Sequence, residues 1–274
     1  MASFFDRLFG RNRARASQPS TGGRLVYAVG DVHGRLDVLA PLVRDIVKDA
    51  AQTQAAQAPG EPKAEPPLLV FLGDYVDRGP QSRGVVELIL ELEAGGGFEV
   101  RALKGNHEEA LLQFLDDPSF GATWAEHGGA STLSSYGVQP PAQRTDPDAW
   151  ARAREAFAAA LPAGHRRFFE SLELMVTEGD YAFVHAGVRP GVPLAVQAER
   201  DLLWIRHDFL EERGRFEKVI VHGHTPLEEP QLTPVRLGVD TGAYATGVLT
   251  AIRLHGEDQR VMQAKARRGA QPAV

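Results

Sequence analysis

Short apolar runs alternate along the chain with segments of helical periodicity, and this order predicts an α/β protein. Residues 25–29 and 68–72 are continuously apolar over the length of a strand, as is typical of strands that are buried on both faces. Apolar residues recur at helical spacing from Leu36 to Val47 and again from Val85 to Leu92, which predicts two helices. Further strands are predicted at residues 98–103, 181–184, 219–221, 237–239 and 248–254.

The remaining segments divide the chain into one domain, a helical insertion and two tails. Residues 109–174 carry helical patterns broken by loops, and we expect them to form an insertion over the strand ends, where substrate-selecting segments lie. Residues 51–67 are rich in Ala, Gln and Pro, which predicts a flexible surface connection. We expect a flexible basic tail at 1–23 and a flexible tail at 257–274, so that the domain spans 24–256.

Polar side chains follow five of the predicted strands directly. In an open α/β sheet, the carboxyl ends of the strands form the edge at which ligands bind. Carboxylates, imidazoles and an amide oxygen without sulfur suit Mn²⁺, Fe²⁺ or Zn²⁺ at a two-metal centre. The clusters, in chain order, are Asp31 with His33, Asp74 with Asp77 and Arg78, Asn106 with His107, His185, and His222 with His224.

Composition and charge narrow the classes of protein and of partner. The net charge of −6 gives the whole molecule no attraction to nucleic acid or to anionic membranes. Cysteine is absent, which excludes disulfides, thiolate catalysis and Cys-type zinc sites. No apolar run reaches the roughly 18 residues of a membrane span, and the charged N-terminus is not a clean signal peptide. We expect a cytoplasmic protein without stable membrane insertion; a short basic amphipathic anchor within residues 1–23 is the alternative to a frayed tail.

Five sequence blocks together resemble a known family. G-D-V-H-G, G-D-Y-V-D-R-G, G-N-H-E, V-H-A-G and H-G-H-T occur in this order between residues 30 and 225. They resemble the calcineurin-like metallophosphoesterases and, within them, the bacterial branch of the phosphoprotein phosphatases. The resemblance extends over residues 24–254. It implies a layered α/β fold in which a central β-sandwich is flanked by helices and carries a helical insertion over the active site.

The same resemblance implies which side chains hold the metals. Two divalent ions are implied, with Mn²⁺ expected and Fe²⁺ or Zn²⁺ as alternatives. Asp74 would bridge both ions, and His222 would lie behind the ligands rather than among them. The remaining ligands implied are Asp31 and His33 for the first metal, and Asn106, His185 and His224 for the second.

The resemblance also implies a catalytic set for phosphoester hydrolysis. A hydroxide that bridges the two metals would attack phosphorus in line, and no covalent phosphoenzyme would form. His107 would protonate the leaving oxygen as general acid, with Asp77 as its orienting partner. Arg78 would bind phosphate oxygens through its planar fork. Arg206 matches a second phosphate-binding arginine; a surface ion pair is its alternative role.

Asp77 bears on the substrate. The second acid after the bridging aspartate is commonly missing from symmetrical dinucleoside-tetraphosphate hydrolases, so its presence favours a serine/threonine protein phosphatase. The expected substrate is therefore a phosphorylated protein or a small phosphate compound, with Ap4A-type hydrolysis as the alternative. The intact ligand set disfavours a non-catalytic scaffold, and the acidic charge disfavours a nuclease. The oligomeric state is left open.

Three further positions have open roles. The segment from Trp124 to Gly129, followed by Thr132, resembles a motif of bacterial family members. His127 stands in it where Asn is usual, and it is predicted either to reach the substrate rim or to cap a helix. Glu108 lies either behind the catalytic residues or at a helix start. Asp240 either supports the metal site or caps a turn.

Overall fold

The computed structural model describes residues 18–56 and 65–266. The predictions for residues 1–17, 57–64 and 267–274 lie outside the described residues. Within the described ranges, no helix is both long enough and apolar enough to cross a membrane.

Two five-stranded mixed sheets form the centre of the molecule. The first sheet has the order β10-β9-β1-β2-β3, in which β1, β2 and β3 are parallel and β9 and β10 are antiparallel to their neighbours. Its strands are β1 Leu25–Val29, β2 Leu68–Phe71, β3 Glu99–Ala102, β9 Val248–His255 and β10 Asp258–Lys265. The second has the order β4-β5-β6-β8-β7, with β5, β6 and β8 parallel. Its strands are β4 Met175–Glu178, β5 Tyr181–Val184, β6 Val219–His222, β7 Gln231–Leu232 and β8 Arg236–Gly238.

The two sheets pack face to face around one apolar layer. Val26 and Val70 of the first sheet share this layer with Phe183 and Val221 of the second. The alternate residues of β1, such as Tyr27, face the helices instead. Because the side chains of a strand alternate between its faces, covering both faces explains why the strands are continuously apolar in sequence. The predicted β-sandwich flanked by helices is confirmed.

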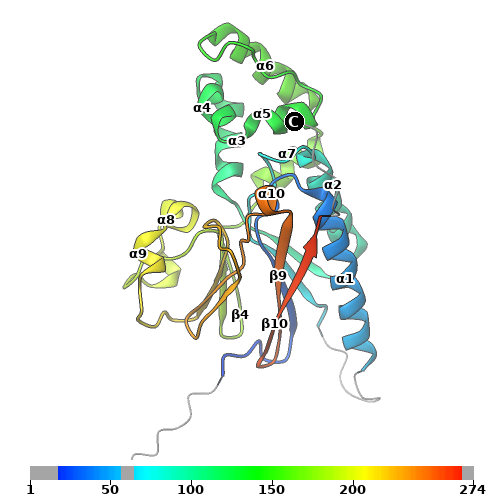
Figure 1. Cartoon of the computed structure of the whole chain (residues 1–274), viewed down its shortest axis with the longest axis vertical. Coiled ribbons are helices and arrows are strands. Elements are labelled where there is room, and N and C mark those ends of the chain that lie inside the picture. The colour runs from blue at the N-terminus through cyan, green and yellow to red at the C-terminus, as the bar shows by residue number, and fades with distance from the viewer. Residues whose placement is uncertain (1–17, 57–64, 267–274) are drawn as a thin grey trace, which may run out of the picture.

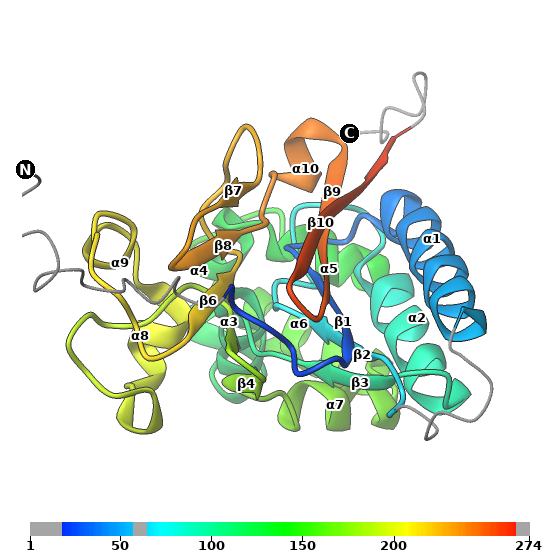
Figure 2. The same cartoon turned by 90° about the horizontal axis from the view of Figure 1, so that it is seen from below.

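Helices cover the outer face of each sheet. Helices α1 (Leu36–Ala55) and α2 (Ser82–Gly95) lie beside the first sheet, and α8 (Glu199–Trp204) and α9 (His207–Leu210) beside the second (Figure 2). Helix α2 ends at Gly95 and is followed by Gly96, whose left-handed conformation at φ 66° is typical of a helix C-cap.

A helical layer stands over one end of the sandwich (Figure 1). It consists of α3 Asn106–Asp116, a 3₁₀ turn at Pro118–Phe120, α4 Gly121–Glu126, α5 Gly129–Ser135, α6 Pro147–Ala160 and α7 Ala163–Glu170. The rings of Phe114, Trp124, Trp150 and Phe157 pack together at its centre, with centroids 4.9 to 6.4 Å apart. These rings belong to the same apolar core as the helix-facing side of the first sheet, so the layer is continuous with the core of the domain.

Three segments differ from their sequence-based prediction. Residues 258–265, placed in a flexible tail, form the edge strand β10, which pairs with β9 along its whole length. Its sequence is polar because exposed residues lie on both of its faces at the sheet edge, although Ala264 is buried, Val261 packs against the core between the sheets and Met262 against the core under the helices. Helix α1 extends to Ala55, because Ala and Gln are strong helix formers. Residues 18–23 are partly ordered, since Ser20 accepts a backbone hydrogen bond from Asp180.

Strand β10 should therefore contribute to stability. We expect a chain ending at Gly256 to lose about 3 kcal/mol, because it no longer buries the apolar side chains of β10 and leaves β9 as an open edge. Its melting temperature should fall by about 6–12 °C in thermal unfolding followed by circular dichroism. The control is a chain ending at Ala266, which keeps β10. Equal melting temperatures for the two shortened chains would contradict the prediction.

Candidate active site

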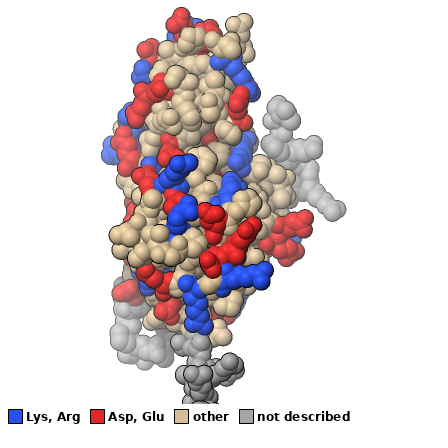
Figure 3. All heavy atoms as spheres, turned by 90° about the vertical axis from the view of Figure 1, so that its left-hand side faces the viewer, with Lys and Arg blue, Asp and Glu red and all other residues tan. Residues whose placement is uncertain are grey.

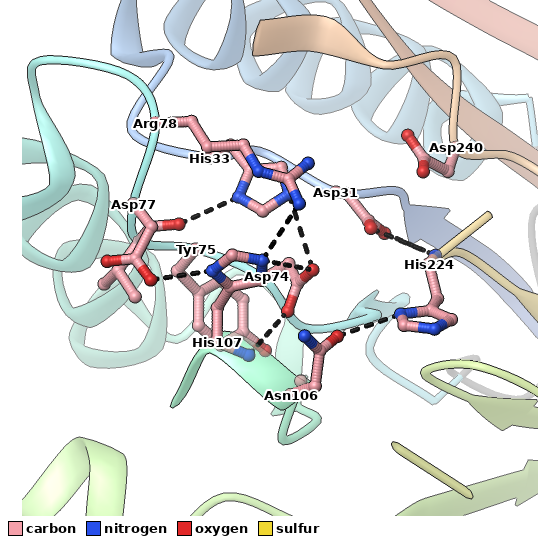
Figure 4. Close-up of polar contacts among 12 residues, drawn as sticks. Asp31, His33, Asp74, Tyr75, Asp77, Arg78, Asn106, His107, His224 and Asp240 are labelled. Carbon is pink, nitrogen blue, oxygen red and sulfur yellow. Dashed lines mark hydrogen bonds and ion pairs between the residues drawn. The ribbon is translucent and has the colours of Figure 1, made fainter. Parts of the chain in front are cut away.

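The strand ends beneath the helical layer bring the predicted site residues together (Figure 4). Two groups of three side chains have ligand atoms within 4.8 Å of one another: His33, Asp74 and His107, and Asp74, His185 and His224. His33 follows β1, Asp74 follows β2, and His185 and His224 follow β5 and β6. His107 lies in the first turn of α3, the helix that comes after β3. Asp74 belongs to both groups, so its carboxylate lies between them.

Backbone strain among the described residues is concentrated at this site. The non-glycine residues with positive φ are His33, Asp74, Asp77, Arg78 and His224, with φ between 46° and 72°. All five are predicted site residues. Left-handed conformations are unfavourable for residues with a Cβ and persist where the surroundings impose them, as at functional sites. The strand-end loops thus hold these side chains in positions that a relaxed loop would not give.

The imidazoles around Asp74 direct lone pairs at its carboxylate. Nδ1 of His33 donates to the carbonyl of Val76 at 2.9 Å, and Nδ1 of His185 donates to that of Leu72 at 2.8 Å. Nε2 of each neutral ring therefore carries a lone pair, and these atoms lie 3.4 and 3.5 Å from the carboxylate oxygens of Asp74. Acceptors facing each other in a buried site require a cation between them.

Asn106 connects the second group. Its side-chain oxygen lies 3.0 Å from Nε2 of His185 and 2.9 Å from Nδ1 of His224. Nε2 of His224 is buried and has no hydrogen-bond partner. Metal–ligand bonds of about 2.0–2.2 Å place neighbouring ligand atoms about 3.0–3.5 Å apart, which is the spacing seen here. The donor set therefore fits a pair of divalent metal ions.

The ionisation of the histidines divides them into two kinds. Burial lowers the pKa of His33 to about 3 and that of His224 to about 2, and it also lowers the pKa of His185. These rings are neutral at pH 7, as metal ligands must be. Burial opposes the charged form of His107 too, but the charge of Asp74 and the hydrogen bond and charge of Asp77 outweigh it and raise the pKa of His107 to about 9. His107 is therefore the protonated histidine of the site.

Asp31 is in neither group of three but is buried beside them. The backbone N–H of His224 donates to its two carboxylate oxygens at 3.2 and 3.0 Å. Gly223 permits this approach, because a Cβ there would lie 2.0 Å from Oδ1 of Asp31. Burial and the carboxylates of Asp240 and Asp74 raise the pKa of Asp31 well above its ordinary value. A cation near this group of carboxylates would relieve their repulsion.

His107 and Asp77 form a buried pair, with Nδ1 2.7 Å from Oδ2. The guanidinium of Arg78 lies 3.1 Å from Nε2 of His107 and stacks on the ring of Tyr244, 4.3 Å from its centroid. Tyr244 belongs to the short helix α10 (Ala243–Thr246). The stacking on Tyr244 holds the planar guanidinium of Arg78 at the entrance of the site.

A cavity of about 430 Å³ opens between this entrance and the helical layer. Arg78 and Arg206 both line it, which brings together the two arginines predicted to bind phosphate. His127 is the C-cap residue of helix α4 and also lines the cavity. It therefore lies at the end of a helix and at the substrate rim, the two places that the sequence left open. The indole of Trp204, 46% exposed, forms part of the wall and donates to Glu109 at 2.7 Å.

Several supporting residues had weak or no sequence signals. Glu108 occupies both predicted positions: it lies in the first turn of α3, and its carboxylate accepts backbone N–H groups of Asp74, Tyr75 and Gly105 at 2.8 to 2.9 Å. Asp240 accepts from the N–H of Gly242, as a turn cap does. Trp204 and Tyr244 could have been found only by their position near site motifs.

A family model described as calcineurin-like phosphoesterase matches residues 25–247. The chain therefore belongs to this family, whose members use divalent metals, and it is a phosphoesterase.

Curated relatives match most of the chain. It is 26% identical over 243 residues to the bis(5'-nucleosyl)-tetraphosphatase PrpE [asymmetrical] of Geobacillus sp. (strain WCH70), covering 82% of this chain and 88% of that protein. It is 28% identical over 236 residues to serine/threonine-protein phosphatase 1 of Salmonella typhimurium, covering 84% and 92%. The fold is similar to a solved serine/threonine phosphatase from Saccharomyces cerevisiae, with a TM-score of 0.52 and 16% identity over 91% of this chain and 82% of that one.

The structure separates the two histidines of the H-G-H-T block. His222 packs edge-on against Phe209 with centroids 4.9 Å apart, whereas His224 lies beside Asn106. We expect purified His224→Ala to lose bound metal, and His222→Ala to retain metal and lose only stability through the cavity it leaves. Elemental analysis of both variants beside the wild type checks this. Metal loss confined to His222→Ala would reverse the assignment.

Proposed function

We propose that the chain is a two-metal phosphomonoesterase acting on phosphoserine and phosphothreonine in proteins. The observation that carries this proposal is the buried His107–Asp77 pair, which faces the same space as the Asp74 cluster and Arg78. We assign Asp31 and His33 to the first metal, Asn106, His185 and His224 to the second, and Asp74 to both. Mn²⁺ suits these oxygen and imidazole donors. The cytoplasmic location stays a prediction.

The roles of the side chains follow from charge and geometry. When bound, the two metals supply neutralisation of the phosphate oxygens and an activated water. Arg78 and Arg206 hold the phosphate from the cavity side, where their planar forks match two oxygens of the group. This orients the bond to be broken toward His107.

His107 completes the reaction. As the P–O bond breaks, Nε2 gives its proton to the departing oxygen, so that a neutral alcohol leaves. Asp77 holds Nδ1 at 2.7 Å and stabilises the protonated ring before this transfer. The alkoxides of serine and threonine are poor leaving groups. Phosphoserine and phosphothreonine are therefore the substrates whose hydrolysis gains most from such an acid.

A second candidate is the hydrolysis of dinucleoside tetraphosphates. The tetraphosphatase relatives favour it, and so does the cavity beside the arginines, whose wall includes Trp204 and Phe120. An indole face stacks with a nucleobase for about 1–3 kcal/mol. Long nucleic acids are not favoured, because Lys and Arg are interspersed with Asp and Glu on the face shown in Figure 3.

The Asp77–His107 pair predicts the alkaline limit of activity. A general acid must be protonated, so kcat should fall as the pH rises through about 9, the pKa of His107. Asp77→Asn removes a negative charge that raises this pKa, so the fall should begin at lower pH. His107→Asn should lower kcat by about 10²–10⁴-fold at unchanged metal content. The measurement is a pH profile of kcat with a phosphoserine peptide. An unshifted limb in Asp77→Asn would contradict the assignment.

The substrate is tested with three compounds in Mn²⁺ buffer: a phosphoserine peptide, diadenosine tetraphosphate and a phosphodiester. We expect the highest kcat/KM for the peptide. Trp204→Ala should change it by less than about threefold, while lowering any tetraphosphate activity about tenfold through the lost stacking. A preference for the tetraphosphate would support the second candidate, and its products, ADP alone or ATP with AMP, would identify the cleaved bond. No turnover of any compound would favour the scaffold.

A further inference from the structure

Helices α4 and α5 contact the loop that carries Asp77 and Arg78. Two side chains of this segment reach the carboxylate of Asp77, which is fully buried. The indole N–H of Trp124 donates to Oδ2 at 2.9 Å, and the hydroxyl of Thr132 donates to Oδ1 at 2.6 Å. Oδ2 is the same oxygen that contacts His107. The carboxylate of Asp77 thus accepts two hydrogen bonds from the helical layer in addition to its hydrogen bond with His107.

Thr132 binds Asp77 at two points. Besides donating to the carboxylate, its hydroxyl oxygen accepts the backbone N–H of Asp77 at 2.8 Å. The Thr132 hydroxyl thus links the main chain of Asp77 to its side chain. Rotating the carboxylate would break the hydrogen bonds from Thr132 to Oδ1 and from Trp124 to Oδ2. Thr132 and Trp124 are both fully buried, so water cannot replace either bond.

The turn between α4 and α5 also holds the backbone of Arg78. The N–H of Arg78 donates to the carbonyl of Gly128 at 3.2 Å, and the hydroxyl of Ser131 donates to the carbonyl of Arg78 at 3.2 Å. Gly128 has φ 109°, and a Cβ on it would lie 2.5 Å from the nitrogen of Arg78. Asp77 and Arg78 themselves have φ of 72° and 67°. These contacts therefore hold two consecutive left-handed residues in place.

We propose that these four residues, the α4–α5 clamp, position the catalytic loop. Trp124 and Thr132 orient Asp77 and, through it, the proton of His107. Gly128 and Ser131 set the direction in which Arg78 leaves the backbone. The inference rests on the proposed function, because it assigns residues that act through His107 and Arg78. It gives the helical insertion a part in catalysis besides lining the substrate cavity.

A purely structural role for the clamp makes a different prediction. Trp124 also packs against Phe114 and Phe157, so its loss could lower stability without affecting the chemistry. The two roles differ in their dependence on the leaving group. An acid that is misaligned slows the departure of a poor leaving group, such as phenolate, much more than that of p-nitrophenolate, which departs without a proton. A fall in the amount of folded enzyme slows both equally.

The first arm of the test therefore compares phenyl phosphate with p-nitrophenyl phosphate. We expect Thr132→Val and Trp124→Phe to lower kcat on phenyl phosphate about 10–100-fold, and on p-nitrophenyl phosphate less than about threefold. Thr132→Ser restores the hydroxyl and should recover kcat to within about threefold of the wild type. The matched control is Trp150→Phe, which removes another buried indole N–H of the helical layer, one that donates to the carbonyl of Arg144. It should leave both rates unchanged.

The second arm addresses Arg78. Ser131→Ala should raise KM and the inhibition constant of inorganic phosphate about threefold, and Gly128→Ala about tenfold, with kcat less affected. Equal losses on both aryl phosphates, or unchanged rates in the Thr132 and Trp124 variants, would overturn the clamp while the proposed function stands. A wild-type enzyme that hydrolyses neither aryl phosphate nor the phosphoserine peptide would refute the proposed function, and the clamp with it.

Discussion

Asp74 places a carboxylate that is 2% exposed among the imidazoles of His33, His107 and His185. A buried charge of this kind is stable only when it is paired. Two of these rings turn their N–H groups away to main-chain carbonyls, so they present lone pairs to Asp74 rather than protons. The protonated His107, 3.9 Å from Asp74, provides one positive charge. The lone pairs of His33 and His185 call for a further cation that the protein itself does not provide, and the other features follow from this constraint.

The β-sandwich makes such an arrangement possible. Both faces of β1 and β2 are covered, so the strands are fixed and their ends keep a constant position. Glu108 then binds the N–H groups at the end of β2 and at the start of α3, which joins two of the strand-end loops. The rigid sheets and this buried carboxylate together support the left-handed conformation of Asp74, for which a free loop would have no compensation.

The sequence predicted the parts of this structure whose signals are local. Strands buried on both faces appear as apolar runs, and polar residues directly after them mark the site edge, so Asp74 and His185 could be placed beforehand. Strand β10 was missed because it is an edge strand with exposed residues on both faces, so its sequence is polar and lacks a clear apolar alternation. The contacts of Trp124 and Thr132 to Asp77 span 47 and 55 residues. A single sequence carries no signal for pairings over such distances, so the motif was visible but its role was not.

The position of that motif bears on how the helical layer relates to the metal site. Residues that only select a substrate could vary without affecting the acid, but here the same segment lines the cavity and hydrogen-bonds to Asp77. His127 lies in this segment, one residue before Gly128, and its side chain faces the cavity while the backbone beside it contacts Arg78. A change of substrate preference through this turn would therefore also move the phosphate-binding arginine. Trp204 ties another part of the cavity wall to the metal site, because its indole donates to Glu109 and packs edge-on against His224 with centroids 6.2 Å apart.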